Sequence, residues 1–135
     1  MEYGMWVRDW MREPALSVDE NCSIEHAGAL MRTSKTEHLP VLGTNGALLG
    51  VIDAVQVLSV GDAAEPVHLH MTESTLAIHP DAPVEVAAAI LRSESRTAVP
   101  VAEAGYIRGV FSRSDALRAL SALESQRIAP EPAAA

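Results

Sequence analysis

Val7-Arg8-Asp9-Trp10-Met11 returns about sixty residues later as Val67-His68-Leu69-His70-Met71. The match continues through Pro40-Val41 and Pro100-Val101, and after these residues the second copy is shorter than the first by one residue. Other matched pairs are Glu13 and Glu73, Glu25 and Glu85, Ala27 and Ala87, Arg32 and Arg92, Gly50 and Gly109, and Leu58 and Leu117. A repeat of this length predicts two similar units that share one core, with a cleft between them.

The composition is typical of a globular chain. The chain has 135 residues, which is long enough for one compact domain, and 48% of them are hydrophobic and 21% are charged. A net charge of −8 without a basic stripe argues against binding to nucleic acid or to anionic membranes. Cys22 is the single cysteine, which fits a reducing compartment. Because we find neither a long apolar run nor the pattern of a signal peptide, we expect a cytoplasmic protein.

The first unit is predicted to be a β-α-β-β-α unit preceded by a short helix or turn. Asn21 is a good N-cap residue, and apolar side chains recur at helical spacing after it. The predicted elements are a helix or turn over 5–11, a strand over 15–18, a helix over 23–34, strands over 39–42 and 47–52 joined at Asn45-Gly46, and a helix over 54–59.

The second unit repeats this series, with Asp81 as the expected N-cap residue. Its predicted elements are a strand over 76–78, a helix over 83–93, strands over 99–102 and 106–111, and a helix over 113–124. The sequence thus predicts an α/β fold with repeat 1 over 1–62, repeat 2 over 63–124 and a disordered tail over 125–135.

The segment Gly109-Val110-Phe111-Ser112-Arg113-Ser114-Asp115 is the strongest candidate for chemistry. It lies where a predicted buried strand turns into a helix, so Ser112 and the free amides of the first turn can face an anion. Asp115 lies at the same helix end, where its carboxylate can accept hydrogen bonds from a vicinal diol such as a ribose. Hydroxyl, amides and carboxylate together indicate a nucleotide site.

A purely structural interpretation accounts for the same residues. Ser112 and Asp115 have the spacing of a capping box, which needs no ligand. In the first repeat Asp53 and Gln56 take the equivalent places. They retain the cap, but the Asp53 carboxylate would repel a phosphate and Gln56 is a poorer ribose acceptor than aspartate. The motif by itself leaves both interpretations open.

Three repeated motifs resemble a tandem pair of cystathionine-β-synthase (CBS) domains, the Bateman module. They are Trp10–Pro14 with His70–Ser74, His38–Val41 with Ala98–Val101, and the segment 109–115, and the similarity covers about residues 5–122. Trp6–Met11 is similar to small stand-alone members of the acetoin-utilisation type. The resemblance implies pseudo-twofold packing, two clefts between the repeats, pairing of two chains, and adenosine-containing ligands (AMP, ADP, ATP, S-adenosylmethionine or NAD-type dinucleotides).

The resemblance also implies particular site residues. The family's ribose motif falls on Ser112 and Asp115, and a phosphate tail would run towards Arg113, Arg96 or Thr97. The further residues expected around the first cleft are Val110, Phe111, Ala15, Leu16, Glu37, His38 and Leu39. The second cleft would be built from Asp53, Gln56, Ala77, Ile78, Thr97 and Ala98. Because Asp53 and Gln56 depart from the family pattern, we expect one competent cleft and one weak or empty cleft.

Other reactive side chains do not form recognisable sites. The five histidines lack the spacing of metal ligands, although His38 lies at the mouth of the predicted first cleft. Cys22, just before a predicted helix, is either a low-pKa thiol or an ordinary reduced cysteine, and the lack of a partner base favours the second. No nucleophile–base pair is evident, so no catalytic residue is predicted.

The sequence therefore predicts a non-catalytic regulatory module that binds an adenine nucleotide and requires no cofactor. Its expected partners are a second copy of the chain and a regulated protein, with neither nucleic acid nor membrane involved. The alternative is a structural or protein-interaction module with degenerate clefts, which dimerises or docks on a partner without a nucleotide.

Overall fold

The structure is a computed structural model, which describes residues 5–13, 16–74 and 76–127. Its elements are α1 (Val7–Trp10), β1 (Val18–Asp19), α2 (Ile24–Ser34), β2 (His38–Leu42), β3 (Leu48–Asp53), α3 (Ala54–Ser59), the 3-10 turn η1 (Val67–Leu69), β4 (Thr72–Glu73), α4 (Val84–Ser93), β5 (Ala98–Glu103), β6 (Tyr106–Ser112) and α5 (Arg113–Arg127). The predicted α/β fold is confirmed.

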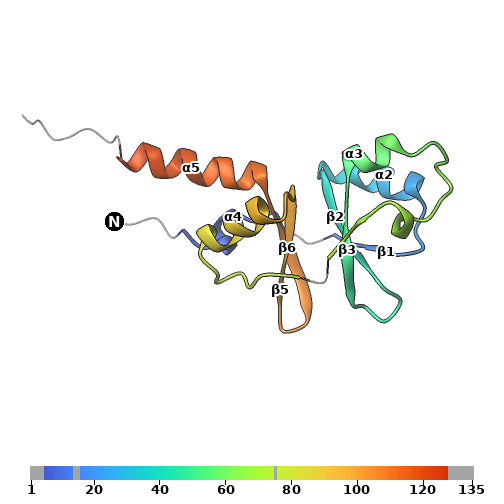
Figure 1. Ribbon diagram of the computed structural model, residues 1–135, viewed down its shortest axis with the longest axis horizontal. Helices are drawn as coiled ribbons and strands as arrows, with labels where there is room; N and C mark the ends of the chain where they lie inside the picture. The colour runs from blue at the N-terminus through green and yellow to red at the C-terminus, as the bar shows by residue number, and fades with distance from the viewer. Residues whose placement is uncertain (1–4, 14–15, 75, 128–135) are drawn as a thin grey trace, which may run out of the picture.

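Two lobes lie side by side with their sheets facing each other and their helices outside (Figure 1). One lobe holds the sheet β1-β2-β3-β4 with α2 and α3, and the other holds the hairpin β5-β6 with α4 and α5. Strand β2 contacts β6, and β3 contacts β5, so the two sheets meet along these strands. This junction positions both clefts.

The helix caps differ from the sequence prediction. Ser23, not Asn21, caps α2, because its hydroxyl accepts a hydrogen bond from the His26 amide at 3.1 Å. The Asn21 amide instead donates to the Asp19 carboxylate in the preceding turn, at 2.8 Å. Helix α4 begins after Pro83 without a side-chain cap, so the Asp81 cap was also wrong.

The opening segment of each repeat, residues 7–13 in the first and 67–73 in the second, packs in the lobe of the other repeat, and we call these two the exchanged segments. Val7 is fully buried in the core of the second lobe, with Phe111, Val99 and Leu91 among its neighbours. Its counterpart Val67 is fully buried in the core of the first lobe. Neither lobe therefore has a complete core without a segment from the other repeat.

Backbone pairing follows the same exchange. Strand β4, from the second repeat, pairs antiparallel with β3 of the first, with Thr72 opposite Val51. In the symmetric place Arg12, from the first repeat, pairs with Val110 of β6, and its amide donates to the Val110 carbonyl at 3.0 Å. The expected strand over 76–78 is reduced to a single parallel bridge between Ile78 and Val101, so that prediction was wrong.

The ends of the elements differ slightly from the remaining predictions. The strand expected over 15–18 is β1 at Val18–Asp19, and Ala15 lies outside the described residues. Helix α5 continues to Arg127, so residues 125–127, expected in the tail, are helical, while 128–135 lie outside the described part. Within the three described ranges, no helix combines the length and apolar character needed to cross a membrane.

Candidate functional site

The first cleft lies where β6 turns into α5, opposite the end of α2 and the start of β2. A cavity of about 250 Å³ adjoins a smaller one of about 60 Å³. Both are lined by Arg12, Thr36, His38 and Val110. The other lining residues are Glu13, Leu16 and Ser34 in the larger cavity, and Glu37, Ser112, Ser114 and Asp115 in the smaller. The cleft is therefore built by both repeats.

Ser112 and Asp115 form a capping box at this cleft. One Asp115 carboxylate oxygen accepts from the Ser112 amide at 2.8 Å and from its hydroxyl at 3.1 Å, and the Asp115 amide donates back to that hydroxyl at 3.3 Å. Asp115 is only 2% exposed, yet it lines the smaller cavity. A carboxylate has about four acceptor sites, so the cap leaves it able to accept from a ligand as well.

Arg118 holds the other Asp115 oxygen. Its Nη2 donates to Asp115 Oδ1 at 2.9 Å and to the Trp10 carbonyl at 2.7 Å, and its guanidinium lies 5.6 Å from the centre of the Trp10 ring. The carboxylate at the cleft is thus fixed to α1, the segment that the first repeat contributes to the second lobe.

His38 joins the two repeats across the cleft. It is buried, and its Nε2 lies 3.2 Å from the Thr97 hydroxyl. Burial lowers the pKa of His38 below its usual 6.5, while the carboxylates of Glu37, Asp53 and Asp115 act in the opposite direction and Arg12 adds to the lowering. The ring is consequently neutral at pH 7.

We expect acid to destabilise the fold through His38. Above the usual pKa of 6.5 both folded and unfolded rings are neutral, but below it the unfolded ring takes up a proton that the buried ring resists. The free energy of unfolding should therefore fall as the pH drops below about 6.5, and fall less in His38→Gln. Urea unfolding of both proteins between about pH 8 and 5 measures this, and parallel pH profiles would contradict it.

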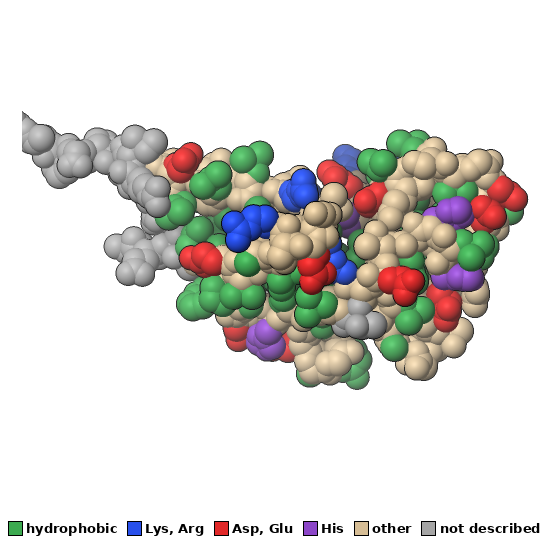
Figure 2. All heavy atoms as spheres, viewed as in Figure 1, with side chains coloured by type: hydrophobic (Ala, Val, Ile, Leu, Met, Phe, Trp, Pro, Cys, Tyr) green, Lys and Arg blue, Asp and Glu red, His purple; other side chains and the backbone are tan. Residues whose placement is uncertain are grey.

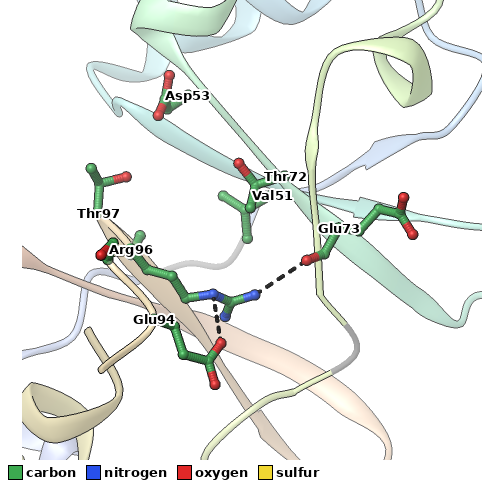
Figure 3. A pocket seen from close by; sticks show the side chains of 9 residues that line it. Val51, Asp53, Thr72, Glu73, Glu94, Arg96 and Thr97 are labelled. Atoms are coloured by element: carbon green, nitrogen blue, oxygen red, sulfur yellow. Dashed lines mark hydrogen bonds and ion pairs between the residues drawn. The ribbon is translucent and has the colours of Figure 1, made fainter. Parts of the chain in front are cut away.

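The second cleft is a cavity of about 370 Å³ between β3, β4 and the start of β5 (Figure 3). Its lining residues are Val51, Asp53, Thr72, Glu73, Glu94, Ser95, Arg96, Thr97 and Ala98. Asp53 and Gln56 form a complete capping box, with both hydrogen bonds at 2.8 Å. Gln56 also donates to the Thr72 hydroxyl at 2.9 Å, so its side-chain amide is already engaged.

The structure brings most of the predicted first-cleft residues together. Ser112, Asp115, Val110, Glu37 and His38 line the smaller cavity, and Leu16 lines the larger one. Arg113 lines a neighbouring cavity of about 170 Å³ between the two capping motifs, where it lies with Asp53 and Thr97.

Phe111 and Leu39 were wrongly expected in the first cleft. Both are fully buried in the cores of their lobes, because successive side chains of a strand point to opposite faces. Ile78 is likewise a core residue of the second lobe. Of the other residues predicted for the second cleft, Asp53, Thr97 and Ala98 line its cavity, whereas Gln56 and Ala77 do not.

The sequence prediction missed five lining residues of the first cleft, one of which is Ser114, next to the predicted Ser112 and Asp115. Arg12 and Glu13 reach it only through the exchanged segment, and Ser34 and Thr36 lie at the end of α2 and just beyond it. The usable signal was the repeat itself, since Arg12 and Glu13 follow the repeated Met11 as Thr72 and Glu73 follow Met71.

Cys22 and the metal-binding residue types do not form a second site. Burial, and then the Asp19 carboxylate, raise the pKa of the Cys22 thiol, which is the opposite of the shift that a reactive low-pKa thiol requires. In the described part of the chain, no group of three or more histidine, cysteine or acidic residues is placed to hold a metal ion.

Comparison with known families agrees with this architecture. The family model of the CBS domain matches residues 7–63 and again residues 60–122. The chain belongs to the CBS domain family. The two matches meet at the linker between α3 and η1, so the CBS pair covers nearly all described residues.

Solved CBS pairs share the fold of this one. The CBS domain pair of protein MJ0100, in complex with 5′-methylthioadenosine and S-adenosyl-L-methionine, is 22% identical, with a TM-score of 0.77 over 87% of this chain and 97% of that one. CBSX2 in complex with AMP is 26% identical, with a TM-score of 0.72 over 90% and 99%. A putative acetoin utilization protein (AcuB) from Vibrio cholerae is 21% identical, with a TM-score of 0.75 over 93% and 99%.

Curated relatives are much longer proteins. The A-adding tRNA nucleotidyltransferase of Aquifex aeolicus is 31% identical over 116 residues, which are 84% of this chain but 14% of that protein. The chain spans 14% to 31% of the length of the curated relatives it matches. The similarity to these proteins is thus confined to a minor part of each.

Proposed function

We propose that this CBS pair is a non-catalytic regulatory module that binds an adenosine-containing ligand in the first cleft. The observation that carries the proposal is the Asp115 carboxylate, buried and fixed by Ser112 and Arg118 where it lines a cavity built by both repeats. CBS pairs of the same fold have been solved with AMP and with S-adenosyl-L-methionine and 5′-methylthioadenosine, which supports this class of ligand.

The charges around the cleft favour a ligand with few phosphates. Among the described residues that line it, Arg12 is the one cation, whereas Glu13, Glu37 and Asp115 are carboxylates. A triphosphate would meet more repulsion than attraction there. AMP or an uncharged adenosine derivative therefore fits better than ATP, with the ribose diol on Asp115.

Binding would act through the relative position of the two lobes. A ligand that contacts both repeats stabilises the arrangement in which the two halves of the cleft are correctly placed, and shifts the population towards it. A partner protein that distinguishes the two arrangements would then respond to the ligand. We place this module in the cytoplasm, where adenosine ligands of this kind are available.

The proposal includes pairing of two copies. Leu58 on α3 and Leu117 on α5 occupy equivalent places in the two repeats and are 84% and 62% exposed. On the face shown in Figure 2, hydrophobic side chains gather mainly over the lobe of α4 and α5. Exposed apolar side chains of this kind are typical of an interface, and the mass in solution tests the pairing.

Thermal unfolding with adenosine, AMP, ATP, S-adenosylmethionine, NAD and a guanosine control tests the ligand. A ligand that binds only the folded state raises the Tm in proportion to ln(1 + [L]/Kd). We expect one adenosine ligand to raise it, and Asp115→Asn to weaken that binding by about 1–3 kcal/mol by removing a charged acceptor. Asp53→Asn, the same substitution in the capping box of the first repeat, should leave adenosine binding intact.

A protein-interaction module with degenerate clefts is the second candidate. It is favoured by the completeness of both capping boxes, and by the engagement of Asp115 with Arg118 before any ligand binds. If no adenosine compound changes the Tm, or if Asp115→Asn binds as well as the unchanged protein, the first proposal fails and this second one gains.

A further inference from the structure

Arg96 lies buried in the wall of the second cleft. Its side chain is 8% exposed and its Nε lies 3.3 Å from the Glu94 carboxylate. Its Nη2 is 3.4 Å from the Glu73 carbonyl, while Nη1 is buried and has no hydrogen-bond partner among the described residues. Because arginine stays charged and a buried donor without a partner is unfavourable, this nitrogen calls for an acceptor.

The other end of the cavity has the opposite character. Figure 3 shows Asp53 across the cavity from Arg96, with Thr97 and Thr72 at the sides between them. Asp53 uses one oxygen to cap α3, so its carboxylate can still accept hydrogen bonds. The Glu73 side chain turns away from Arg96 in the same view.

These charges select the class of ligand. A simple anion would satisfy Arg96 but would also meet the carboxylates of Glu94 and Asp53. A simple cation would suit Asp53 but would leave Arg96 Nη1 without an acceptor. A molecule that carries a carboxylate at one end and an ammonium group at the other offers an acceptor to Arg96 and a positive charge to Asp53, and it adds no net charge to a cavity lined by one guanidinium and three carboxylates.

We propose that the second cleft binds a free amino acid, with its carboxylate on the Arg96 guanidinium and its ammonium group towards Asp53. The hydroxyls of Thr72 and Thr97 line the space between the two, and Val51 and Ala98 offer apolar contact to a side chain. The cavity of about 370 Å³ is large enough for a whole amino acid.

The two clefts differ at the positions that matter for this ligand. Thr36 takes the place of Arg96 in the first cleft and Ser34 the place of Glu94, so the first cleft lacks the buried guanidinium. The inference therefore does not depend on the adenosine proposal. It gives the second cleft, which we expected to be weak or empty, a ligand of another class.

Thermal unfolding with each of the twenty L-amino acids at about 10 mM, followed by calorimetric titration of the best, tests the inference. We expect at least one to raise the Tm. Its amide, which lacks the carboxylate, and its N-acetyl form, which lacks the ammonium group, should bind at least about tenfold more weakly, as expected when a charge-assisted contact is lost.

Four variants locate the site. Arg96→Met should reduce binding at least about tenfold, while Arg92→Met, an exposed arginine of α4, should have no effect. Asp53→Asn keeps the helix cap and removes the charge, so it should also weaken binding, and it decides the matter if Arg96→Met fails to fold. Asp115→Asn, in the first cleft, should leave amino-acid binding unchanged even if adenosine binding is lost.

Several results would overturn the inference. They are no Tm change with any of the amino acids, undiminished binding in Arg96→Met or Asp53→Asn, equal binding of the N-acetyl form, or binding of acetate or phosphate alone in place of an amino acid. Loss of amino-acid binding in Asp115→Asn with binding retained in Asp53→Asn would move the ligand to the first cleft, and would overturn it as well.

Discussion

Gly50→Ala and Gly109→Ala should each lower the free energy of unfolding by about 3 kcal/mol, because there is no room for a side chain at either position. A Cβ on Gly109 would lie 2.5 Å from the Arg12 carbonyl oxygen, and one on Gly50 would lie closer still to the Thr72 carbonyl oxygen. Both oxygens belong to the exchanged segments. The substitution would therefore push an exchanged segment off the sheet edge and open the core that it completes.

Urea unfolding of Gly50→Ala and Gly109→Ala measures this effect, with Gly61→Ala as the matched control. A Cβ on Gly61 would meet no heavy atom of the described residues within 4 Å, and Gly61 does not adopt a positive φ. Alanine there should therefore change stability by less than about 1 kcal/mol. If the three variants unfold at the same urea concentration, the prediction is contradicted, because the close backbone approach at the two glycines would then not affect stability.

Phe111→Ala should lower the free energy of unfolding by about 3–5 kcal/mol, the usual cost of emptying a buried aromatic site. Phe111 is fully buried among residues of α4, β5 and α1, including Val7 from the first repeat. Because domains of this size have a total stability of about 5–15 kcal/mol, the variant should lose a large share of its stability and unfold at a much lower urea concentration.

Tyr106→Ala is the matched control for Phe111→Ala, since Tyr106 lies on the same strand but is 75% exposed. It should change stability by about 0.5 kcal/mol or less. Phe111→Leu, which keeps part of the volume, should fall between the two. Equal stability of Phe111→Ala and Tyr106→Ala would mean that the second lobe relaxes to fill the space, and would contradict the prediction.

The internal repeat was sufficient to predict the fold, because each unit carries its own helical and strand periodicity. The predicted range of α3 was confirmed as it stood, and those of α2 and β6 to within one residue. The exchange was not predictable in this way. Strand β4 has two residues, too few for a periodic pattern, and its partner β3 belongs to the other repeat.

In the candidate site, too, local features could be predicted from the sequence and contacts between distant segments could not. That Ser112 and Asp115 lie together at the start of α5 could be predicted, because their spacing at a strand–helix junction is a local property. Arg12 and the buried position of Arg96 depend on which segments meet in three dimensions, and a single sequence gives no distance between them. Phe111 was misplaced because the phase of the β6 alternation relative to the cleft follows from the packing of the two lobes.

Because of the exchanged segments, the division of the chain into two repeats differs from the division of the structure into two lobes. The core of each lobe includes residues from the other repeat, so neither repeat alone contains all the residues of one lobe. A rotation of one lobe relative to the other would strain the backbone pairing at Arg12 and at Thr72. Arg12 lines the first cleft and Thr72 lines the second. Each cavity is therefore bounded by one exchanged segment, so both clefts exist only because the two repeats complete each other.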